Sequence, residues 1–162
     1  MKDKVYELLN DQVRMEFASG WDYLGFAAYF DALGLTGFSH WYKIQAMEEQ
    51  AHAMKIYDYL IKQGKKVELQ EIPAPAHNFD GVSDVLNKGM EHEVAVSKAI
   101  HNICALADSV EDYATKNFLE WFVKEQVEEE SNARELIEQL ELFGTTPDSL
   151  YLLDRACAAR RK

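Results

Sequence analysis

The stretch KKVELQEIPAPAHNFDG, residues 65–81, decides how this chain folds. Pro73 and Pro75 prevent a regular helix there, because proline lacks a backbone N–H and clashes with the preceding turn. The segment is also too long for a simple turn. When extended, its seventeen residues reach up to about 55–60 Å, whereas a 24-residue helix is about 36 Å long. The segment is therefore predicted to cross the whole length of a helical bundle and to start the third helix parallel to the second.

Helix-forming segments lie on both sides of this crossover. The 162 residues include only 3 prolines and 8 glycines, and the rest is rich in Ala, Leu, Glu, Lys, Gln and Met, which favour helices. With 48% hydrophobic residues, the chain is long enough for one well-buried domain over residues 1–162. The predicted helices are residues 4–33, 40–63, 83–109, 112–143 and 148–159. The fold class is therefore all-α, a four-helix bundle over about residues 4–143 with a short fifth helix.

Turn and capping residues set the predicted helix ends. Ser39 is the expected N-cap of the second helix, and Thr146 with Pro147 provides an N-cap and an N1 proline for the fifth. Glycines are expected to end three of the helices, and these are Gly34, Gly64 and Gly144. The fifth helix is too short to join the bundle and needs another surface to pack against.

Charge and composition exclude several classes of function. The chain has 28 acidic and 17 basic side chains and a formal charge of −11, which disfavours nucleic acid as a partner and favours the attraction of cations. No run of about 18 apolar residues exists, and MKDKVYELLN lacks the apolar stretch of a signal peptide. We therefore expect a cytoplasmic protein without a membrane span. The final ARRK is predicted to be a solvated tail.

The two cysteines are expected to be reduced packing residues. Cys104 and Cys157 are far apart in the sequence, and neither has a second cysteine or a histidine beside it. This spacing supports neither a disulfide framework nor a zinc site.

Polar, metal-competent side chains interrupt the apolar heptad lines near the middle of all four long helices. On the first helix, for example, Glu16 stands between Leu9 and Tyr23. On the second helix, the stretch EEQAH places two such residues three positions apart. Across the four helices the interrupting residues are Glu16, then Glu49 and His52, then Glu93, and finally Gln126 and Glu129.

These interior carboxylates require a cation. Burying an unpaired carboxylate costs several kcal/mol, and the same lines carry no lysine or arginine. Glu49 and His52 lie about 60° and about 4.5 Å apart on a helix, so both can face one ion. Carboxylate oxygens with one imidazole suit iron or manganese, and a pair of iron ions is the predicted occupant. The other histidines are interpreted as loop, cap or surface residues, and these are His40, His77, His92 and His101.

The sequence resembles the non-haem bacterial ferritins over essentially its full length. The shared motifs are MEF in the first helix, AMEEQAH in the second, GMEHE in the third, FLEWFVKEQVEEE in the fourth and GTTPDSL before the fifth. The resemblance implies a ferroxidase centre that holds two iron ions. It assigns the first iron to Glu16, Glu49 and His52 and the second to Glu93 and Glu129, with Glu49 bridging and Gln126 close to the first iron.

The resemblance also implies neighbours of this centre. Tyr23 and Trp121 match the family's aromatic residues beside the two irons. Glu48, Glu125 and Glu128, together with Glu129, occupy the positions of a third, outlying iron site.

Three departures separate the chain from other di-iron proteins. Bacterioferritins repeat Glu-x-x-His on the fourth helix, but here the pair is Gln126 and Glu129, so the two metal sites should be unequal. Bacterioferritins also have a haem-ligating methionine where this chain has Gln50, and Met47 and Met54 are out of register, so no haem is expected. Two cysteines are too few for the four-cysteine iron domain of rubrerythrins.

The predicted function is iron storage with ferroxidase activity. Fe(II) is oxidised at the centre by dioxygen or peroxide, and the resemblance implies storage as a ferric mineral in a homo-oligomeric shell of 24 subunits, with the fifth helix among symmetry mates. One alternative remains at this point, a small di-iron enzyme that removes peroxide with the same ligands but without a shell. An interaction bundle would have leucines at the glutamate positions and generally a secretory signal, and the sequence meets neither condition.

Overall fold

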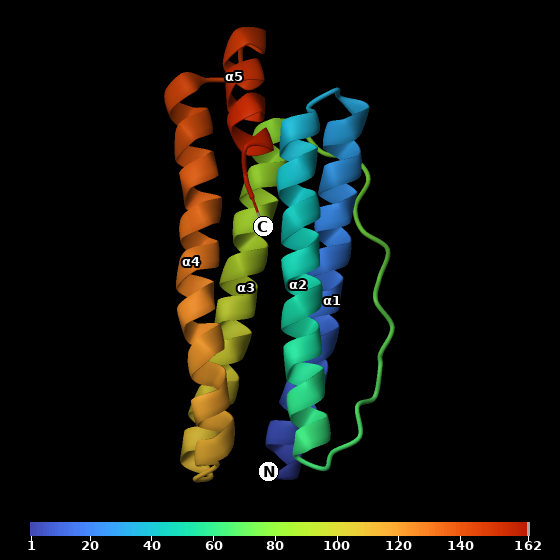
Figure 1. The fold of residues 1–162 in the computed structure, drawn as a ribbon, viewed down its shortest axis with the longest axis vertical. Helices are drawn as coiled ribbons and strands as arrows, with labels where there is room; N and C mark the ends of the chain where they lie inside the picture. The colour runs from blue at the N-terminus through green and yellow to red at the C-terminus, as the bar shows by residue number, and fades with distance from the viewer. Residues whose placement is uncertain (162) are drawn as a thin grey trace.

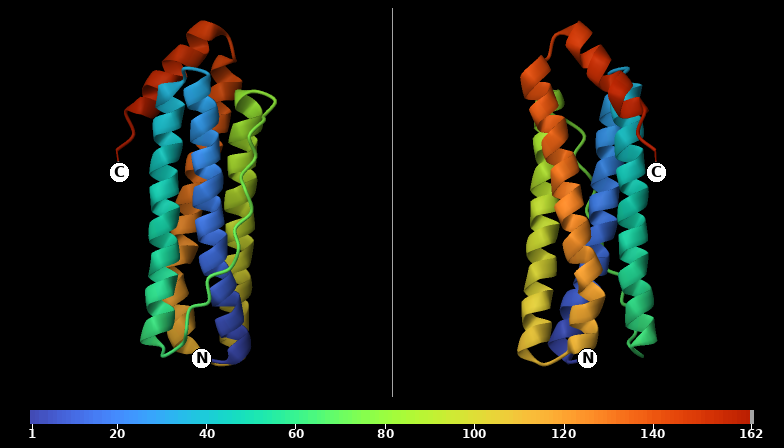
Figure 2. Two further views of the ribbon diagram at one scale, coloured as in Figure 1. Left: turned by 90° about the vertical axis from the view of Figure 1, so that its right-hand side faces the viewer. Right: turned by 60° about the vertical axis from the view of Figure 1, so that its left-hand side comes forward.

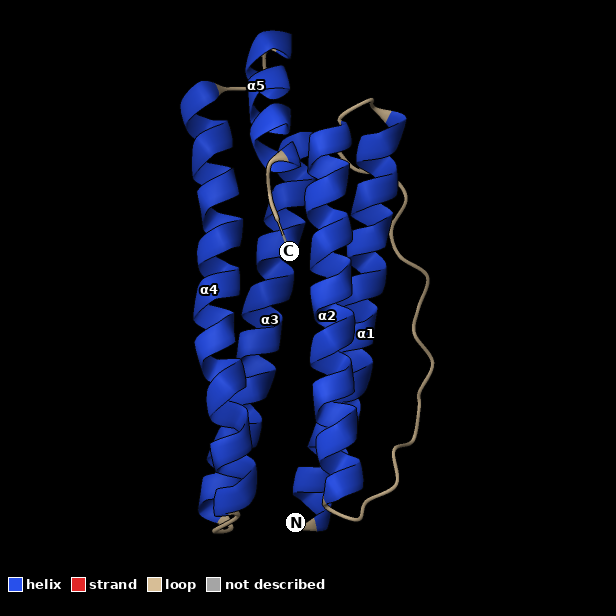
Figure 3. Ribbon diagram, viewed as in Figure 1, coloured by secondary structure: helices blue, strands red, loops and turns tan. Residues whose placement is uncertain are grey.

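The computed structural model describes residues 1–161, which form five α-helices joined by loops (Figures 1 and 3). Their bounds are α1 Asp3–Ala32, α2 Thr36–Lys62, α3 Val82–Ser109, α4 Tyr113–Phe143 and α5 Pro147–Ala158. The predicted all-α class and five helices are therefore confirmed, and only the start of α2 differs by more than one or two residues. Among residues 1–161, no helix is both long enough and apolar enough to cross a membrane.

The long connection between α2 and α3 is the predicted crossover. It starts at the lower end of the bundle in Figure 1 and climbs to the upper end, so α2 and α3 run in the same direction. Figure 2 shows that it lies over α1 on its way to α3. The helices therefore pair as α1 with α2 and α3 with α4, each pair antiparallel.

Side chains of α1 hold the crossover in place. Asn10 accepts a hydrogen bond from the Glu68 N–H at 2.8 Å and donates one to the Glu68 carbonyl at 2.8 Å. The Phe79 ring packs edge-on against Phe26 at 5.4 Å between centroids. At Gly25 an added Cβ would lie only 3.0 Å from Pro75, so this glycine lets the crossover approach α1 closely.

A carboxylate of α5 caps the N-terminus of α2, and the prediction that Ser39 is the N-cap is wrong. Asp154 accepts hydrogen bonds from the N–H groups of Gly37 at 2.8 Å and Phe38 at 2.9 Å. Because these first-turn donors are already satisfied, α2 begins at Thr36, and Ser39 lies buried inside the helix. A Cβ at Gly37 would lie 1.7 Å from the Asp154 carbonyl oxygen, so the contact depends on this glycine.

The other predicted caps are present. The Thr146 side chain accepts a hydrogen bond from the Ser149 N–H, and Pro147 is the first residue of α5. Gly34, Gly64 and Gly144 follow the helix ends with φ between 70° and 82°, a backbone conformation that glycine adopts without strain. Cys104 and Cys157 are free thiols, as predicted.

The basic tail is only partly solvated, because Arg160 folds back onto α2. Its guanidinium donates to Glu48 at 2.8 Å, whereas Arg161 is exposed. The prediction of a solvated tail is therefore wrong for Arg160, and Lys162 lies outside the described residues.

Two apolar clusters fill the interior and leave a polar layer between them. One cluster includes Tyr23, Phe30 and Leu86, and the other includes Leu9, Ile100 and Phe122. Burial of this kind contributes about 1.5–3 kcal/mol for each large side chain. The clusters hold the four helices rigidly on either side of the polar layer.

We expect Asp154→Ala to lower the free energy of unfolding by about 1–2 kcal/mol, the usual cost of losing a helix cap. Thermal unfolding of this variant measures the effect. The exposed Asp58 of α2 supplies the matched control, Asp58→Ala, which should leave the melting temperature unchanged. Equal stability of the two variants would show that Asp154 does not cap α2.

Candidate metal centre

The polar layer between the apolar clusters contains all six residues that were predicted from the heptad lines. Each is at most 4% exposed. They come from four helices and are Glu16 of α1, Glu49 and His52 of α2, Glu93 of α3, and Gln126 and Glu129 of α4. Lysine and arginine are missing from the buried side chains of residues 1–161.

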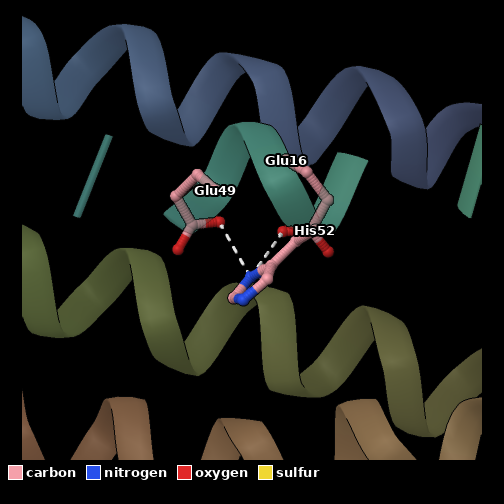
Figure 4. A group of neighbouring side chains, drawn as sticks. All are labelled: Glu16, Glu49 and His52. Carbon is pink, nitrogen blue, oxygen red and sulfur yellow. Dashed lines mark ion pairs between the residues drawn. The ribbon is translucent and has the colours of Figure 1, made fainter. Parts of the chain in front are cut away.

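Three of these residues converge on one point (Figure 4). The Nδ1 atom of His52 lies 3.7 Å from a Glu49 oxygen and 4.0 Å from a Glu16 oxygen. One ligand atom from each of the three residues falls within 4.8 Å of the others. This separation suits three ligands that share one ion between them, because metal–ligand bonds of about 2 Å would reach all three atoms.

A glycine of α1 allows this convergence. A Cβ at Gly20 would lie 3.1 Å from the Ala46 carbonyl oxygen and 3.3 Å from the Glu49 Cβ. Gly20 thus lets α1 and α2 approach each other one turn after Glu16. A side chain at this position would require Ala46 or Glu49 to shift by a few tenths of an ångström.

A second group of side chains surrounds Glu93. The Tyr23 hydroxyl donates a hydrogen bond to one Glu93 oxygen, and the Gln126 amide donates to the other at 3.2 Å. Glu129 accepts a hydrogen bond from Gln45 at 2.9 Å. The resemblance placed Gln126 close to the first iron, but its amide contacts Glu93, which was assigned to the second iron. Tyr23, which the resemblance placed beside the centre, contacts Glu93 as well.

Several polar atoms in the layer have no hydrogen-bond partner among residues 1–161. Four of them belong to the centre, namely Glu16 Oε2, Glu49 Oε1, His52 Nδ1 and Gln45 Oε1. Leaving a buried polar atom unpaired costs about 1–3 kcal/mol, so such atoms are rare in proteins. Carboxylate oxygens and an imidazole nitrogen are also the ligands that iron accepts, and the residues present fit a bound cation.

Burial changes the acidity of these carboxyl groups. It raises the pKa of Glu16 well above the usual value, and the Glu49 charge adds to the effect. Burial likewise raises the pKa of Glu49, with Glu93 as the next cause, and it raises that of Glu93. Burial and the Glu93 charge raise the pKa of Glu129 from 4.5 to about 7. Without a cation the centre therefore retains protons at neutral pH, and a metal ion must displace them.

Of the predicted outlying residues, Glu125 and Glu129 lie close to His52. Glu125 places an oxygen 3.8 Å from His52 Nε2 and is 30% exposed. Glu125, Glu129 and His52 form a second group within 4.8 Å. Glu48 instead pairs with Arg160 at 2.8 Å, and the exposed Glu128 belongs to neither group. His52 belongs to both groups, because its Nδ1 atom lies near Glu16 and Glu49 and its Nε2 atom lies near Glu125.

Sequence reasoning missed the amides that orient the carboxylates. Gln12 donates to Glu16 at 2.8 Å, and Gln45 donates to Glu129. Gln12 comes one helical turn before Glu16, and Gln45 lies on the same line as His52. An amide at an interior position next to a predicted ligand was the signal that could have identified both.

Two further neighbours surround the centre. The Trp121 ring lies 5.3 Å from the His52 ring, and the Lys55 ammonium lies 3.7 Å above Trp121. His92, predicted to be peripheral, pairs with Asp22 at 3.1 Å and is 31% exposed. Trp121 therefore covers His52, whereas His92 stays at the edge of the bundle.

Comparisons with known proteins agree with this geometry. Residues 6–143 match the model of the ferritin-like domain. A bacterial non-heme ferritin of Staphylococcus haemolyticus is 39% identical, with 95% of this chain and 93% of the relative covered. The corresponding protein of Staphylococcus saprophyticus is 36% identical over 99% of this chain and 96% of its own length. An open-pore ferritin from the archaeon Archaeoglobus fulgidus has a solved structure with a TM-score of 0.97, at 40% identity and 99% coverage of both chains.

We expect Glu129→Gln to stabilise the metal-free protein at pH 8 but not near pH 4. Because the pKa of Glu129 is raised to about 7 from 4.5, the folded chain binds more protons than the unfolded chain between these values. The carboxyl group therefore lowers stability as pH rises through this window. At pH 8 the variant's free energy of unfolding should exceed that of the unmodified protein by close to about 3 kcal/mol. Thermal unfolding at both pH values measures this difference. The control is Glu128→Gln, at an exposed neighbouring residue. If Glu129→Gln stabilised the protein as much at pH 4 as at pH 8, the raised pKa of Glu129 would not be the cause.

Proposed function

Because the chain belongs to the ferritin family, we propose that it stores iron after oxidising Fe(II) at the centre between its four long helices. The observation that carries this proposal is the set of unpaired buried ligand atoms on Glu16, Glu49 and His52. A stable bundle has no reason to bury these atoms without a ligand. Iron is the substrate of this site and the cargo of the assembled protein.

The first Fe(II) is assigned to Glu16, Glu49 and His52, and the second to Glu93 and Glu129, with Glu49 between them. Each ion gives one electron to dioxygen or peroxide, and the product Fe(III) leaves to join a ferric mineral. The protein supplies ligand placement and proton control. As Fe(II) enters, the carboxyl groups release the protons that burial had held on them, which keeps the overall charge of the layer nearly constant.

Neighbouring side chains hold these ligands in position. Gln12 and Gln45 orient Glu16 and Glu129, and the Tyr23 hydroxyl orients Glu93. Hydrogen bonds of this kind limit the rotation of ligating carboxylates and tune their basicity. Tyr23 retains its proton there, because burial and the Glu93 charge raise its pKa.

Storage requires a hollow assembly, and we place α5 at its contacts between subunits. Large apolar side chains at this end of the molecule are 61–76% exposed, and they are Leu142, Phe143, Tyr151 and Leu152. Covering such a patch is a common reason for association. A shell of 24 copies is the form that we propose. The free thiols fit a reducing compartment, and we place the protein in the cytoplasm.

The double variant Glu49→Ala/His52→Ala tests the centre. It should slow the initial oxidation of two Fe(II) per chain by on the order of a hundred-fold or more, because losing ligands costs at least as much as losing the groups that orient them. Stopped-flow absorbance of Fe(III) measures the rate, and circular dichroism checks the helices. The control is Glu120→Ala/His101→Ala, at exposed positions. A folded double variant that oxidises iron at the original rate would refute the assignment.

The two iron positions should bind with unequal affinity. One has an imidazole and two carboxylates within 4.8 Å, whereas at the other Gln126 and Glu129 stand where bacterioferritins have a glutamate and a histidine. Anaerobic titration with Fe(II) should therefore resolve a tighter and a weaker ion per chain. The double variant Gln126→Glu/Glu129→His, which restores Glu-x-x-His on α4, should narrow the difference. Two equal ions in the unmodified chain would contradict this prediction.

A further inference from the structure

Arg160, which follows the end of α5, is held against α2 by three separate contacts. Its guanidinium Nη2 donates to Glu48 Oε2 at 2.8 Å. Its Cζ lies 4.3 Å from the centroid of the Trp41 ring. Its carbonyl oxygen lies 3.0 Å from His40 Nε2. The residue is therefore a fixed part of the α2 surface.

The contact with Glu48 is strong for one near the surface. The side chains of Arg160 and Glu48 are only 17% and 28% exposed, so water screens the pair weakly. A charged donor and a charged acceptor form hydrogen bonds about twice as strong as neutral groups do. Stacking on Trp41 adds a cation–π contact and restricts the guanidinium to this position.

Glu48 is also close to the metal ligands. It precedes Glu49, and its charge contributes, after burial and the Glu93 charge, to the raised pKa of Glu129. Glu129 belongs to the outer group with Glu125 and His52. Arg160 therefore holds a carboxylate whose charge reaches the outer group.

We propose that Arg160 is a tethered cation that competes with a metal ion for Glu48, so that the C-terminal tail sets the affinity of the outer metal position. This inference rests on the proposed function, since it takes the outer group of His52, Glu125 and Glu129 as the position of an Fe(II) ion beyond the central pair, with Glu48 as the carboxylate that Arg160 withholds from it. The ion must break the hydrogen bond at 2.8 Å before Glu48 can turn toward it. It must also bind close to a positive charge. Both effects weaken the outer position relative to the centre, which favours passage of iron over its retention there.

Anaerobic titration of the assembled protein with Fe(II) tests the competition. In Arg160→Gln the ions beyond the first two per chain should bind more tightly, on the order of ten-fold, while the first two are little changed. The matched control is Arg161→Gln, which removes the same charge at the exposed neighbouring residue and should leave the outer affinity near that of the unmodified protein. Arg160→Lys keeps the positive charge but loses the planar guanidinium group. Its affinity for Fe(II) at the outer position should therefore lie between those of the unmodified protein and Arg160→Gln. Elution volume and melting temperature confirm that each variant assembles.

A double-mutant cycle separates the specific pair from a general effect of charge. In a Glu48→Gln background, Arg160→Gln should no longer tighten outer binding. The proposal is overturned if Arg160→Gln behaves like Arg161→Gln, or if its effect persists without the Glu48 carboxylate. If the unmodified protein binds no Fe(II) at all, the proposed function fails and this inference fails with it. Two ions bound normally with no effect of Arg160 would contradict the competition alone.

Discussion

The burial of four carboxyl groups and one imidazole, without a buried lysine or arginine in residues 1–161, is the constraint on which the structure depends. Four ionised carboxylates cannot neutralise one another in an apolar interior. The metal-free chain meets the constraint by retaining protons, as the raised pKa values show, and the amides of Gln12, Gln45 and Gln126 satisfy part of the hydrogen bonding. A bound cation replaces the protons and satisfies the remaining ligand atoms.

The fold supports this layer with rigid apolar packing on either side of it. The crossover lets α2 and α3 run in the same direction, and each of the four long helices contributes at least one predicted ligand to the layer. Gly20 then allows α1 and α2 to come close beside Glu49. At the upper end, Asp154 fastens α5 to the start of α2, and this anchor brings Arg160 within reach of Glu48. The short fifth helix thereby connects the end of the bundle with the outer edge of the centre.

Most of the fold and the buried ligands could be predicted from the sequence because they depend on local patterns. Heptad spacing placed Glu16 and Glu49 in the interior, and Pro73 and Pro75 defined the crossover. The errors concern contacts between distant residues. Ser39 had the chemistry of an N-cap, but a carboxylate more than 100 positions later takes that role. The charge run at the C-terminus likewise gave no sign that Arg160 would return to α2. Periodicity reports which face of a helix is buried, and it does not report which distant side chain reaches it.

The central claim is that the buried centre delivers iron to storage, and iron loading tests it most directly. Fe(II) is added in air, far above the two or three ions that each chain can ligate, and the iron that elutes with the protein on size exclusion is counted. The account predicts a very large particle that carries iron in large excess over its ligands. About two ions per chain on a small species would contradict storage and would favour a di-iron enzyme.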